Sequence, residues 1–267
     1  MLCEIKNRFY IDQIGNALNQ TFSKEFDFKG ESHNFIEAVY VASGSVQITE
    51  DEKVYILNEG DIIFHAPMEF HCIKSFGETS PTIRNLSFTT VGNLPKTIFD
   101  GVYHLNSGQK DLFLKCFDLS KKYETSEKIS KYMGQYILSN LYSLLIDICT
   151  ELEVQDAFSA ETSARTYTEI VTTMQEALYK NFSLYEFASS NNISVSYLKK
   201  LFIRYANVSP KTFYNSLRIK EACRLLAVGL SVSAIAEKMN FSSPNYFSLF
   251  FKKHLNCTPI EYKRNIK

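Results

Sequence analysis

The carboxyl-terminal third of the chain repeats itself with an offset of 49 residues, and this repeat restricts the fold more than any other feature of the sequence. Five positions recur identically and five more recur with similar residues. The identical pairs are Ser194 and Ser243, Tyr197 and Tyr246, Phe202 and Phe251, Asn207 and Asn256, and Pro210 and Pro259. A pattern that recurs in this way indicates that one structural unit, here of three helices, occurs twice.

Helix-start signals occur throughout this region. Ser183 and Glu186 form a capping box, which satisfies free backbone amides at a helix start. Proline after serine or threonine lies in a first helical turn, where its missing N–H costs nothing. Seven helices are predicted, one over 167–180 and the others following Ser183, Ser194, Ser209, Ser231, Ser243 and Thr258. In each copy a short helix, a tight turn and a second helix follow one another, which is the arrangement that brings the second helix to a DNA major groove.

The second helix of each copy separates apolar and polar positions onto two faces. The residues predicted to pack inward are Tyr197, Leu198, Leu201 and Phe202, and then Tyr246, Phe247, Phe250 and Phe251. The residues predicted to bind DNA are Val195, Ser196, Lys199, Lys200 and Arg204, and then Ser243, Asn245, Ser248, Lys252 and Lys253. Arg204, Lys252 and Lys253 fall late in their helices and suit phosphates, whereas the lysines and asparagine nearer the helix starts suit base edges. For the lysines the alternative is a solvated face.

The repeat region also carries the positive charge of a chain whose formal net charge is zero. From Ser163 to Lys267 there are 15 Lys and Arg against 6 Asp and Glu, whereas the preceding residues hold 14 against 23. A basic domain suggests a polyanionic partner, because nonspecific nucleic-acid affinity comes chiefly from neutralising phosphates. A plain helical bundle with basic ends would explain the charge and the aromatic stripes, but not the doubled pattern of caps.

The first half of the chain has the pattern of a β domain followed by a helix. Short β-type runs separated by turn residues predict an antiparallel sandwich or barrel, and they cover 36–42, 46–49, 53–57, 61–65 and 83–88. Apolar residues then recur at steps of three and four and predict a long helix around Glu127 to Leu152; they are Ile129, Met133, Ile137, Leu141, Leu145, Ile148 and Leu152. The polar stretch 154–165 has no periodicity, so the domain boundary is predicted there.

This long helix is apolar on more than one side, since Tyr136, Leu138 and Tyr142 lie off its main face. A helix that is apolar on two sides must bury both. One side is expected to meet the β domain and the other a second chain, so a homodimer is predicted. Packing of both sides within one chain is the alternative.

The segment 167–266 closely resembles the AraC/XylS family of transcription regulators. The residues that carry the resemblance in the second copy are Phe241, Ser242, Tyr246, Phe247, Phe251, Lys252, Lys253, Thr258, Pro259 and Tyr262. Asn240 stands where the family usually has glycine, and asparagine tolerates the left-handed backbone that this turn requires. The resemblance implies two helix-turn-helix subdomains joined by a long helix, here 210–226, and a regulator that binds double-stranded DNA. RNA polymerase is a further partner that it allows.

The β-rich half looks like the cupin-type effector domain common in that family. His33, Glu37 and Gly44 fit the first cupin box, and Gly60, Asp61, Pro67 and His71 fit the second. In cupin enzymes histidines and a glutamate of these boxes hold a metal, since imidazole and carboxylate suit iron, manganese or zinc. Phe35 stands where the second histidine of the first box is expected. The expected role of His33, Glu37 and His71 is therefore to line a pocket for a small-molecule effector, with neither a metal nor another cofactor. Iron binding by this set of two histidines and one carboxylate, and a purely structural role as satisfied core polar groups, are the alternatives.

These features predict an α+β chain made of a cupin-like sensory β-barrel at 1–108, a helical linker and dimerisation region at 109–153, and a double helix-turn-helix domain at 165–267. The expected function is effector-controlled, sequence-specific regulation of transcription, without enzymatic activity. A metal-dependent cupin enzyme fused to a nucleic-acid-binding domain, and an interaction protein that does not bind DNA, are the alternatives. No run of about 18 apolar residues and no signal-peptide core is present, so the chain is expected in the cytoplasm, away from membranes.

The six cysteines are scattered without CxxC spacing, and buried thiols are expected at Cys3, Cys72, Cys116, Cys149, Cys223 and Cys257.

Overall fold

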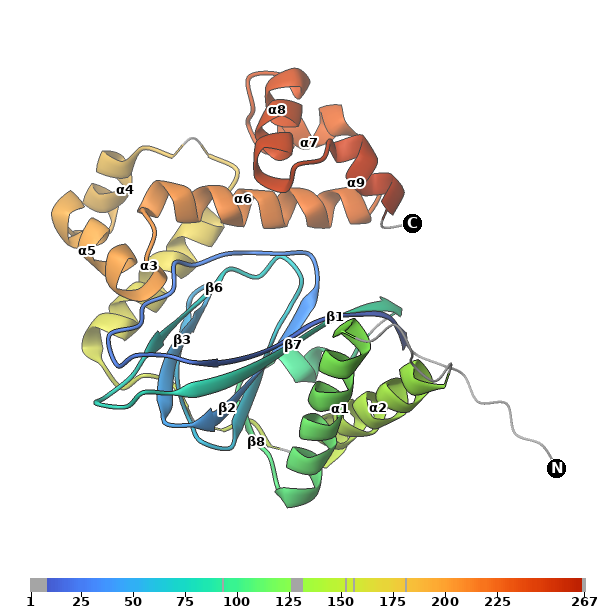
Figure 1. Cartoon of the computed structure of the whole chain (residues 1–267). Helices are drawn as coiled ribbons and strands as arrows, with labels where there is room; N and C mark the ends of the chain where they lie inside the picture. The colour runs from blue at the N-terminus through green and yellow to red at the C-terminus, as the bar shows by residue number, and fades with distance from the viewer. Residues whose placement is uncertain are drawn as a thin grey trace.

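The computed structural model describes residues 9–92, 94–125, 132–151, 153–155, 157–180 and 182–265. A β domain with two helices on one flank forms the amino-terminal part, and a helical domain lies against another side of it (Figure 1). The predicted α+β class, with a β domain followed by an all-α domain, is confirmed.

Within the described residues the strands form two antiparallel sheets. The five-stranded sheet has the order β1 (Phe9–Thr21), β7 (Thr82–Gly92), β2 (Ile36–Ser43), β5 (Asp61–His65) and β8 (Tyr103–His104), and a short 3₁₀ helix η1 (Lys96–Phe99) precedes β8. The three-stranded sheet has the order β4 (Lys53–Asn58), β3 (Ser45–Glu50) and β6 (His71–Ser75). The sheets face each other across a core to which both contribute, for example Val39 and Ile63 from one and Ile48 and Leu57 from the other.

The chain crosses between the sheets at two glycine turns. Gly44 joins β2 to β3 with a φ of +75°, and a Cβ at this position would lie 2.9 Å from the backbone of Pro81. Gly60 joins β4 to β5 with a φ of +93°. These turns put consecutive strands into opposite sheets, and among the described strands no hydrogen-bonded ladder closes the pair. The predicted β-barrel is therefore corrected to two facing sheets.

All five runs that were expected to be strands are strands, namely β2, β3, β4, β5 and β7. The strands β1, β6 and β8 were not predicted. β1 lies at the sheet edge with most of its side chains exposed, and its register with β7 shifts twice. An exposed strand with an interrupted register has no regular apolar alternation, which is the sequence signal for strands.

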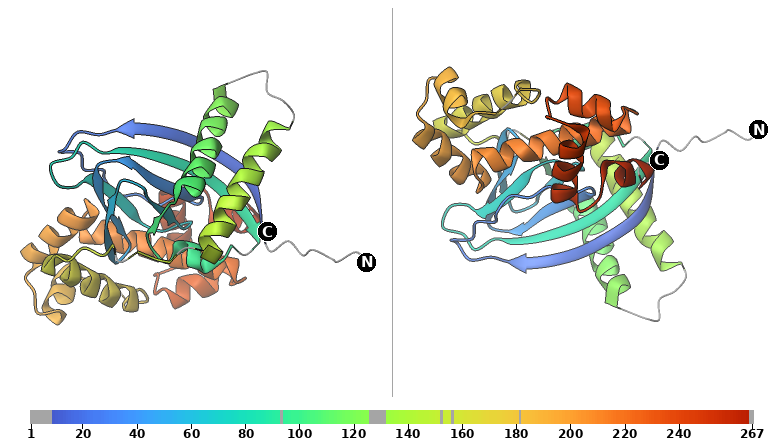
Figure 2. Two further views of the ribbon diagram at one scale, coloured as in Figure 1. Left: turned by 90° about the horizontal axis from the view of Figure 1, so that it is seen from below. Right: turned by 90° about the horizontal axis from the view of Figure 1, so that it is seen from above.

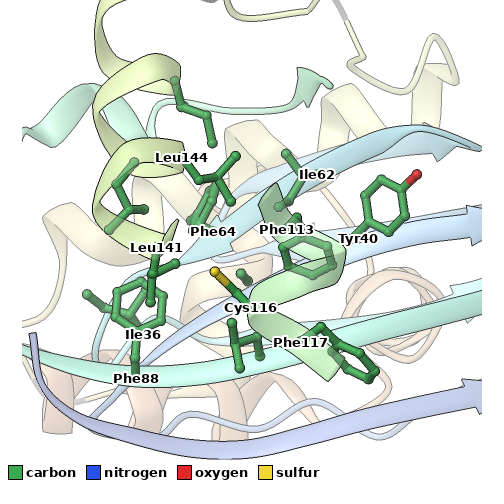
Figure 3. Close-up of a cluster of buried hydrophobic side chains, with 14 of the residues drawn as sticks. Ile36, Tyr40, Ile62, Phe64, Phe88, Phe113, Cys116, Phe117, Leu141 and Leu144 are labelled. Atoms are coloured by element: carbon green, nitrogen blue, oxygen red, sulfur yellow. The ribbon is translucent and has the colours of Figure 1, made fainter. Parts of the chain in front are cut away.

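Helices α1 (Ser107–Thr125) and α2 (Met133–Glu151) pack on the outer face of the five-stranded sheet (Figures 2 and 3). Because strand side chains alternate between faces, Tyr40 and Phe64 point outward to meet Phe113 and Leu141 of these helices. The periodic residues predicted to be buried on the second of these helices are buried at Ile137, Leu141, Leu145 and Ile148, and Met133 is half-buried. Glu127, Ile129 and Leu152 of that prediction lie outside the described residues.

The seven predicted helices of the carboxyl-terminal domain are confirmed within the described residues. They are α3 (Thr162–Glu176), α4 (Leu184–Ser190), α5 (Val195–Ala206), α6 (Pro210–Ala227), α7 (Val232–Lys238), α8 (Pro244–Leu255) and α9 (Pro259–Asn265). The predicted caps accept hydrogen bonds from backbone amides three residues later, at Ser183, Ser194, Ser209, Ser231, Ser243 and Thr258. α3 begins five residues earlier than expected.

Helix α6 is shared by two separate hydrophobic cores. Its first half contributes Phe213 and Leu217 to the core of α3, α4 and α5. Its second half contributes Ala222 and Leu226 to the core of α7, α8 and α9. The two copies of the repeat are therefore separate units on one helix, and Figure 1 shows them at its two ends.

The polar stretch predicted as a free boundary is partly held by the β domain. Ser159 donates its amide to the Val54 carbonyl at 2.8 Å, and Ile56 donates to the Ala157 carbonyl at 2.8 Å. Tyr55 stacks on Phe158 with ring centroids 4.9 Å apart. Edge strand β4 has unpaired backbone groups, and this segment satisfies them.

Among the described helices, none combines the length and the apolarity that crossing a membrane requires. Three thiols are buried as expected (Cys72, Cys116 and Cys223), whereas Cys149 and Cys257 are half-buried and Cys3 lies outside the described residues.

Candidate nucleic-acid interface and ligand site

The turns before α5 and α8 depend on asparagine in the left-handed region. Asn192 and Asn240 have φ angles of +55°, so the expectation that asparagine can replace glycine in the second turn is confirmed. Asn207 and Asn256, an identical pair of the repeat, end α5 and α8 with φ angles of +51° and +57°. The second turn has one residue more, since two residues separate Asn240 from Ser243 and one separates Asn192 from Ser194.

The exposed face of α5 and α8 contains most of the residues predicted to bind DNA. Those that are exposed are Ser196, Lys199, Lys200, Arg204, Asn245, Lys252 and Lys253. Val195, Ser243 and Ser248 are half-buried. The hydroxyl of Ser243 caps α8, and that of Ser248 donates to the Pro244 carbonyl at 2.9 Å. The hydroxyl groups of both serines therefore form hydrogen bonds within their own helix.

Two aromatic residues that were predicted to pack inward are largely exposed. Tyr197 is 39% exposed and Tyr246 is 55% exposed, whereas Leu198, Leu201, Phe202, Phe247 and Phe251 are buried and Phe250 is half-buried. Each tyrosine lies in the first turn of its helix. With Leu249, which is 68% exposed, they add apolar surface to the two helices. The sequence did not predict this exposure, because both tyrosines belong to the stripe of aromatic residues that was expected to pack inward.

Arg204 lies at the end of α5 that faces the β domain. Its guanidinium forms an ion pair with Glu161 at 2.7 Å, and its carbonyl accepts a hydrogen bond from Lys74 of β6 at 3.0 Å. The neighbouring Tyr205 carbonyl accepts from the Cys72 thiol at 2.9 Å. The last turn of α5 is thus bound to the β domain.

A cavity of about 250 Å³ lies between the two sheets of the β domain. Its polar lining residues are Gln20, Glu31, Glu37, His65, His71 and Asn85. Its apolar lining residues are Leu18, Phe22, Phe26, Phe28, Val39, Ile73 and Ile83. Two of the three residues predicted to line a pocket, Glu37 and His71, do so.

The third predicted residue, His33, is next to this cavity and touches the other two. Its Nε2 lies 3.9 Å from Glu37 Oε2, and its ring stacks on Phe35 with centroids 3.7 Å apart. His71 Nε2 lies 3.4 Å from the same oxygen. The structure therefore brings the three predicted residues together.

His65 belongs to the same cluster and was missed. It pairs with Glu37 across β2 and β5, and its ring stacks on that of His71 with centroids 4.0 Å apart. Its Nδ1 lies 2.5 Å from Glu50 Oε1, and both side chains are buried. The signal in the sequence was its place at the end of a β run; the cross-strand register that sets it opposite Glu37 is a tertiary feature.

Burial controls the protonation of this cluster. Burial lowers the pKa of His65 and of His71 to about 4, so both rings are neutral at pH 7. The Glu37 carboxyl group thus faces imidazole nitrogens.

An acidic group lies beside the cluster, where the β domain meets α6. Asp51 forms a salt bridge with Lys220 of α6, and Glu69 lies 4.0 Å from the same ammonium group. Burial, reinforced by neighbouring carboxylates, raises the pKa of Glu69 to about 8, and burial raises that of Glu50 to about 8. One lysine thus faces several buried carboxyl groups.

Comparisons with known proteins give consistent results. Residues 187–265 match the family model of a helix-turn-helix domain. The HTH-type transcriptional activator RhaR of Mannheimia succiniciproducens is 21% identical over 245 residues, which are 86% of this chain and 85% of that protein. The uncharacterized HTH-type transcriptional regulator YidL of Escherichia coli is 30% identical over 98 residues, which are 36% of this chain and 33% of that protein. A crystal structure of ToxT from Vibrio cholerae aligns over 98% of this chain and 99% of that one, with 15% identity and a TM-score of 0.41.

The raised pKa of Glu69 predicts how stability changes with pH. Between pH 4.5 and about pH 8 the unfolded chain has an ionised Glu69 and the folded chain a protonated one, so stability falls as the pH rises. In Glu69→Gln the decrease in unfolding free energy with rising pH should be smaller, by up to about 1.4 kcal/mol per pH unit. Urea unfolding of the full chain at pH 6, 7 and 8 measures the effect. Glu25→Gln, at an exposed position, is the control, and identical pH slopes for both variants would contradict the assignment.

Proposed function

We infer that the carboxyl-terminal part of this chain is a helix-turn-helix domain of the AraC type and that the chain is a sequence-specific DNA-binding transcription regulator. The observation that carries this conclusion is the doubled unit, in which α5 and α8 each follow a short helix and an asparagine turn. The relatives described as transcription regulators support the same function. They lend no support to a cupin enzyme.

We propose that each chain contacts two successive major-groove faces, with α5 in one and α8 in the other. The two units share α6, whose 18 residues span about 27 Å, so α5 and α8 are held at a fixed separation. The bound site is then asymmetric, with half-sites about 10 base pairs apart. The proposed base-edge residues are Ser196, Lys199, Lys200, Asn245 and Ser248. The proposed phosphate contacts are Arg204, Lys252 and Lys253, with Val195 and Ser243 at the helix starts beside the DNA.

The cavity between the sheets is the proposed site of a small-molecule effector. It combines a mostly apolar wall with a few polar groups, which is the usual composition of a ligand pocket. Glu37 and His71 are the proposed polar contacts, with His33 supporting them from behind. At about 250 Å³ the cavity suits a molecule smaller than most drugs.

We further propose that the chain forms a homodimer through α2. Leu138 and Tyr142, two of the residues cited for a second apolar side, pack against the β domain of the same chain. Tyr136 and Ile146 are 46% and 52% exposed and lie along a stripe of small residues, Ser139, Ser143 and Thr150, that permits close helix approach. The exposed stripe supports a dimer interface that is narrower than the one predicted from the sequence, because Leu138 and Tyr142 do not take part in it.

A regulator of this kind works in the cytoplasm, where bacterial DNA lies, and we propose that location. Because one relative is described as a transcriptional activator, contact with RNA polymerase is the proposed route from DNA binding to transcription. We propose no catalytic activity for the β domain.

The division between base-reading and phosphate-binding residues is tested with DNA duplexes selected from a random library by the purified chain. Lys199→Ala and Asn245→Ala should lose about 1–3 kcal/mol of binding free energy on the selected duplex and little on a scrambled one. Lys253→Ala should weaken binding to both duplexes and reduce the slope of log affinity against log salt concentration by about 1, because one phosphate contact is lost. Gel-shift titrations at two salt concentrations measure this, with Lys110→Ala on α1 as control. A library without an enriched sequence would contradict the proposed function, and equal losses on both duplexes would contradict the division of roles.

The effector pocket is tested by filling it. Val39→Phe projects a ring into the cavity, whereas Val41→Phe on the same strand enlarges a core residue that does not line it. Small molecules extracted from the purified chains are identified by mass spectrometry, and circular dichroism verifies folding. We expect a molecule carried by the native chain and by Val41→Phe but not by Val39→Phe. Equal recovery of the molecule from the native chain and both variants would show that it binds outside this cavity.

The dimer is tested by sedimentation at high micromolar concentration. The native chain should sediment as a dimer, and Ile146→Glu should sediment as a monomer because it buries a charge in an apolar contact. Val228→Glu changes an exposed valine at the end of α6 and should leave the dimer intact. A monomeric native chain is the result that would reject this proposal.

A further inference from the structure

Three of the five histidines of the chain converge on one carboxylate. His33 precedes β2, His65 ends β5 and His71 begins β6, so the three come from separate segments. The ligand atoms of Glu37, His65 and His71 all lie within 4.8 Å of one another. His71 and His65 are 5% and 2% exposed.

In two of these rings, the hydrogen-bond partner of Nδ1 determines which ring nitrogen carries the proton. His33 Nδ1 lies 3.1 Å from the Phe35 carbonyl oxygen, and His71 Nδ1 lies 3.1 Å from the Glu69 carbonyl oxygen. A carbonyl oxygen only accepts hydrogen bonds, so each Nδ1 is the donor and each neutral ring has its lone pair on Nε2. Both Nε2 atoms are buried without a hydrogen-bond partner. They face Glu37 Oε2, which also presents lone pairs, so the arrangement lacks a positive charge at its centre.

His65 and Glu37 have the outer partners that metal ligands usually have. His65 Nδ1 contacts the buried Glu50 carboxyl at 2.5 Å, and Glu37 Oε1 accepts a hydrogen bond from Asn85 at 3.1 Å. Metal-binding histidines typically donate their second N–H to a carboxylate or a backbone carbonyl, which orients the ring. Two other groups could be considered. In Glu31, His33 and His71 the carboxylate is exposed. In Glu50, His65 and Glu69 the Glu50 oxygen already contacts His65, and Glu69 accepts from the Ala66 amide at 2.9 Å.

We propose that Glu37, His65 and His71, with His33 as a fourth donor, bind a divalent transition-metal ion. Imidazole with one carboxylate suits Fe²⁺, Co²⁺, Ni²⁺ or Zn²⁺, whereas Mg²⁺ and Ca²⁺ require oxygen ligands. A cation between these groups gives each unpartnered Nε2 and the Glu37 carboxylate a common partner. His65 stands in for the histidine that Phe35 replaces, although it lies outside the spacing of either cupin box.

This site is independent of DNA binding, but it adds to the proposed effector pocket. Glu37, His65 and His71 all line the cavity between the sheets. A metal held by them is open to a small molecule in that cavity. Metal and DNA binding are measured separately, so failure of one proposal leaves the other standing.

The test is a titration of the metal-free full chain with Co²⁺, followed by its visible absorption bands. We expect one Co²⁺ per chain, displaced by Zn²⁺ but not by excess Mg²⁺. His65→Ala and His71→Ala should each bind at least about 100-fold more weakly. The control variants are His104→Ala and His254→Ala, which alter the two histidines outside the cluster and should bind normally.

A second variant separates metal loss from misfolding. Glu50→Gln keeps all four ligands and removes only the ionisable carboxyl group behind His65, so it should weaken Co²⁺ binding about 10- to 100-fold while circular dichroism stays native. Co²⁺ should also raise the melting temperature of the native chain. Unchanged affinity in Glu50→Gln and His65→Ala, or no Co²⁺ bands in the native chain at one equivalent, would overturn the proposal.

Discussion

The turn between β3 and β4 holds the two halves of the molecule together. The buried Asp51 carboxylate at its tip forms a salt bridge with the partly exposed Lys220 of α6, and the Asp51 carbonyl accepts a hydrogen bond from Tyr167 of α3 at 3.0 Å. The Glu52 carbonyl accepts from Thr168 at 2.6 Å. Removing Lys220 would be destabilising, because the buried Asp51 carboxylate would lose its charged partner. The orientation of the helical domain on the β domain therefore depends on this turn.

The same turn connects the cavity with the helix shared by the two DNA-binding units. Glu50, one residue before Asp51, contacts His65 in the wall of the cavity, whereas Asp51 contacts α6. The β domain also binds the last turn of α5 through Cys72 and Lys74. A ligand or metal that moves His65 thus acts one residue away from the contact that positions α6. This proximity gives the proposed effector cavity a short physical connection to the DNA-binding helices.

The repeat shows how one helical unit is adapted at two places. Both copies use a serine cap and two left-handed asparagines, and in the first copy the β domain also binds the carboxyl-terminal end of α5. Both Arg204 of the first copy and its counterpart Lys253 are exposed, but Arg204 pairs with Glu161, whereas Lys253 forms no ion pair among the described residues. Local signals are therefore shared between the copies, and their freedom to meet DNA differs because of packing elsewhere in the chain.

The sequence by itself determined the features that depend on neighbouring residues. Serine caps, prolines in first turns and apolar spacing predicted the helices, and β-type runs predicted five strands, because these signals act within a few residues. The sequence also predicted that His33, Glu37 and His71 lie at one site. Only the tertiary structure decided which sheet each strand joins, that Tyr197 and Tyr246 are exposed, and that His65 lies opposite Glu37. Those outcomes depend on strand register and domain contacts between residues far apart in the chain, for which a single sequence carries no local signal.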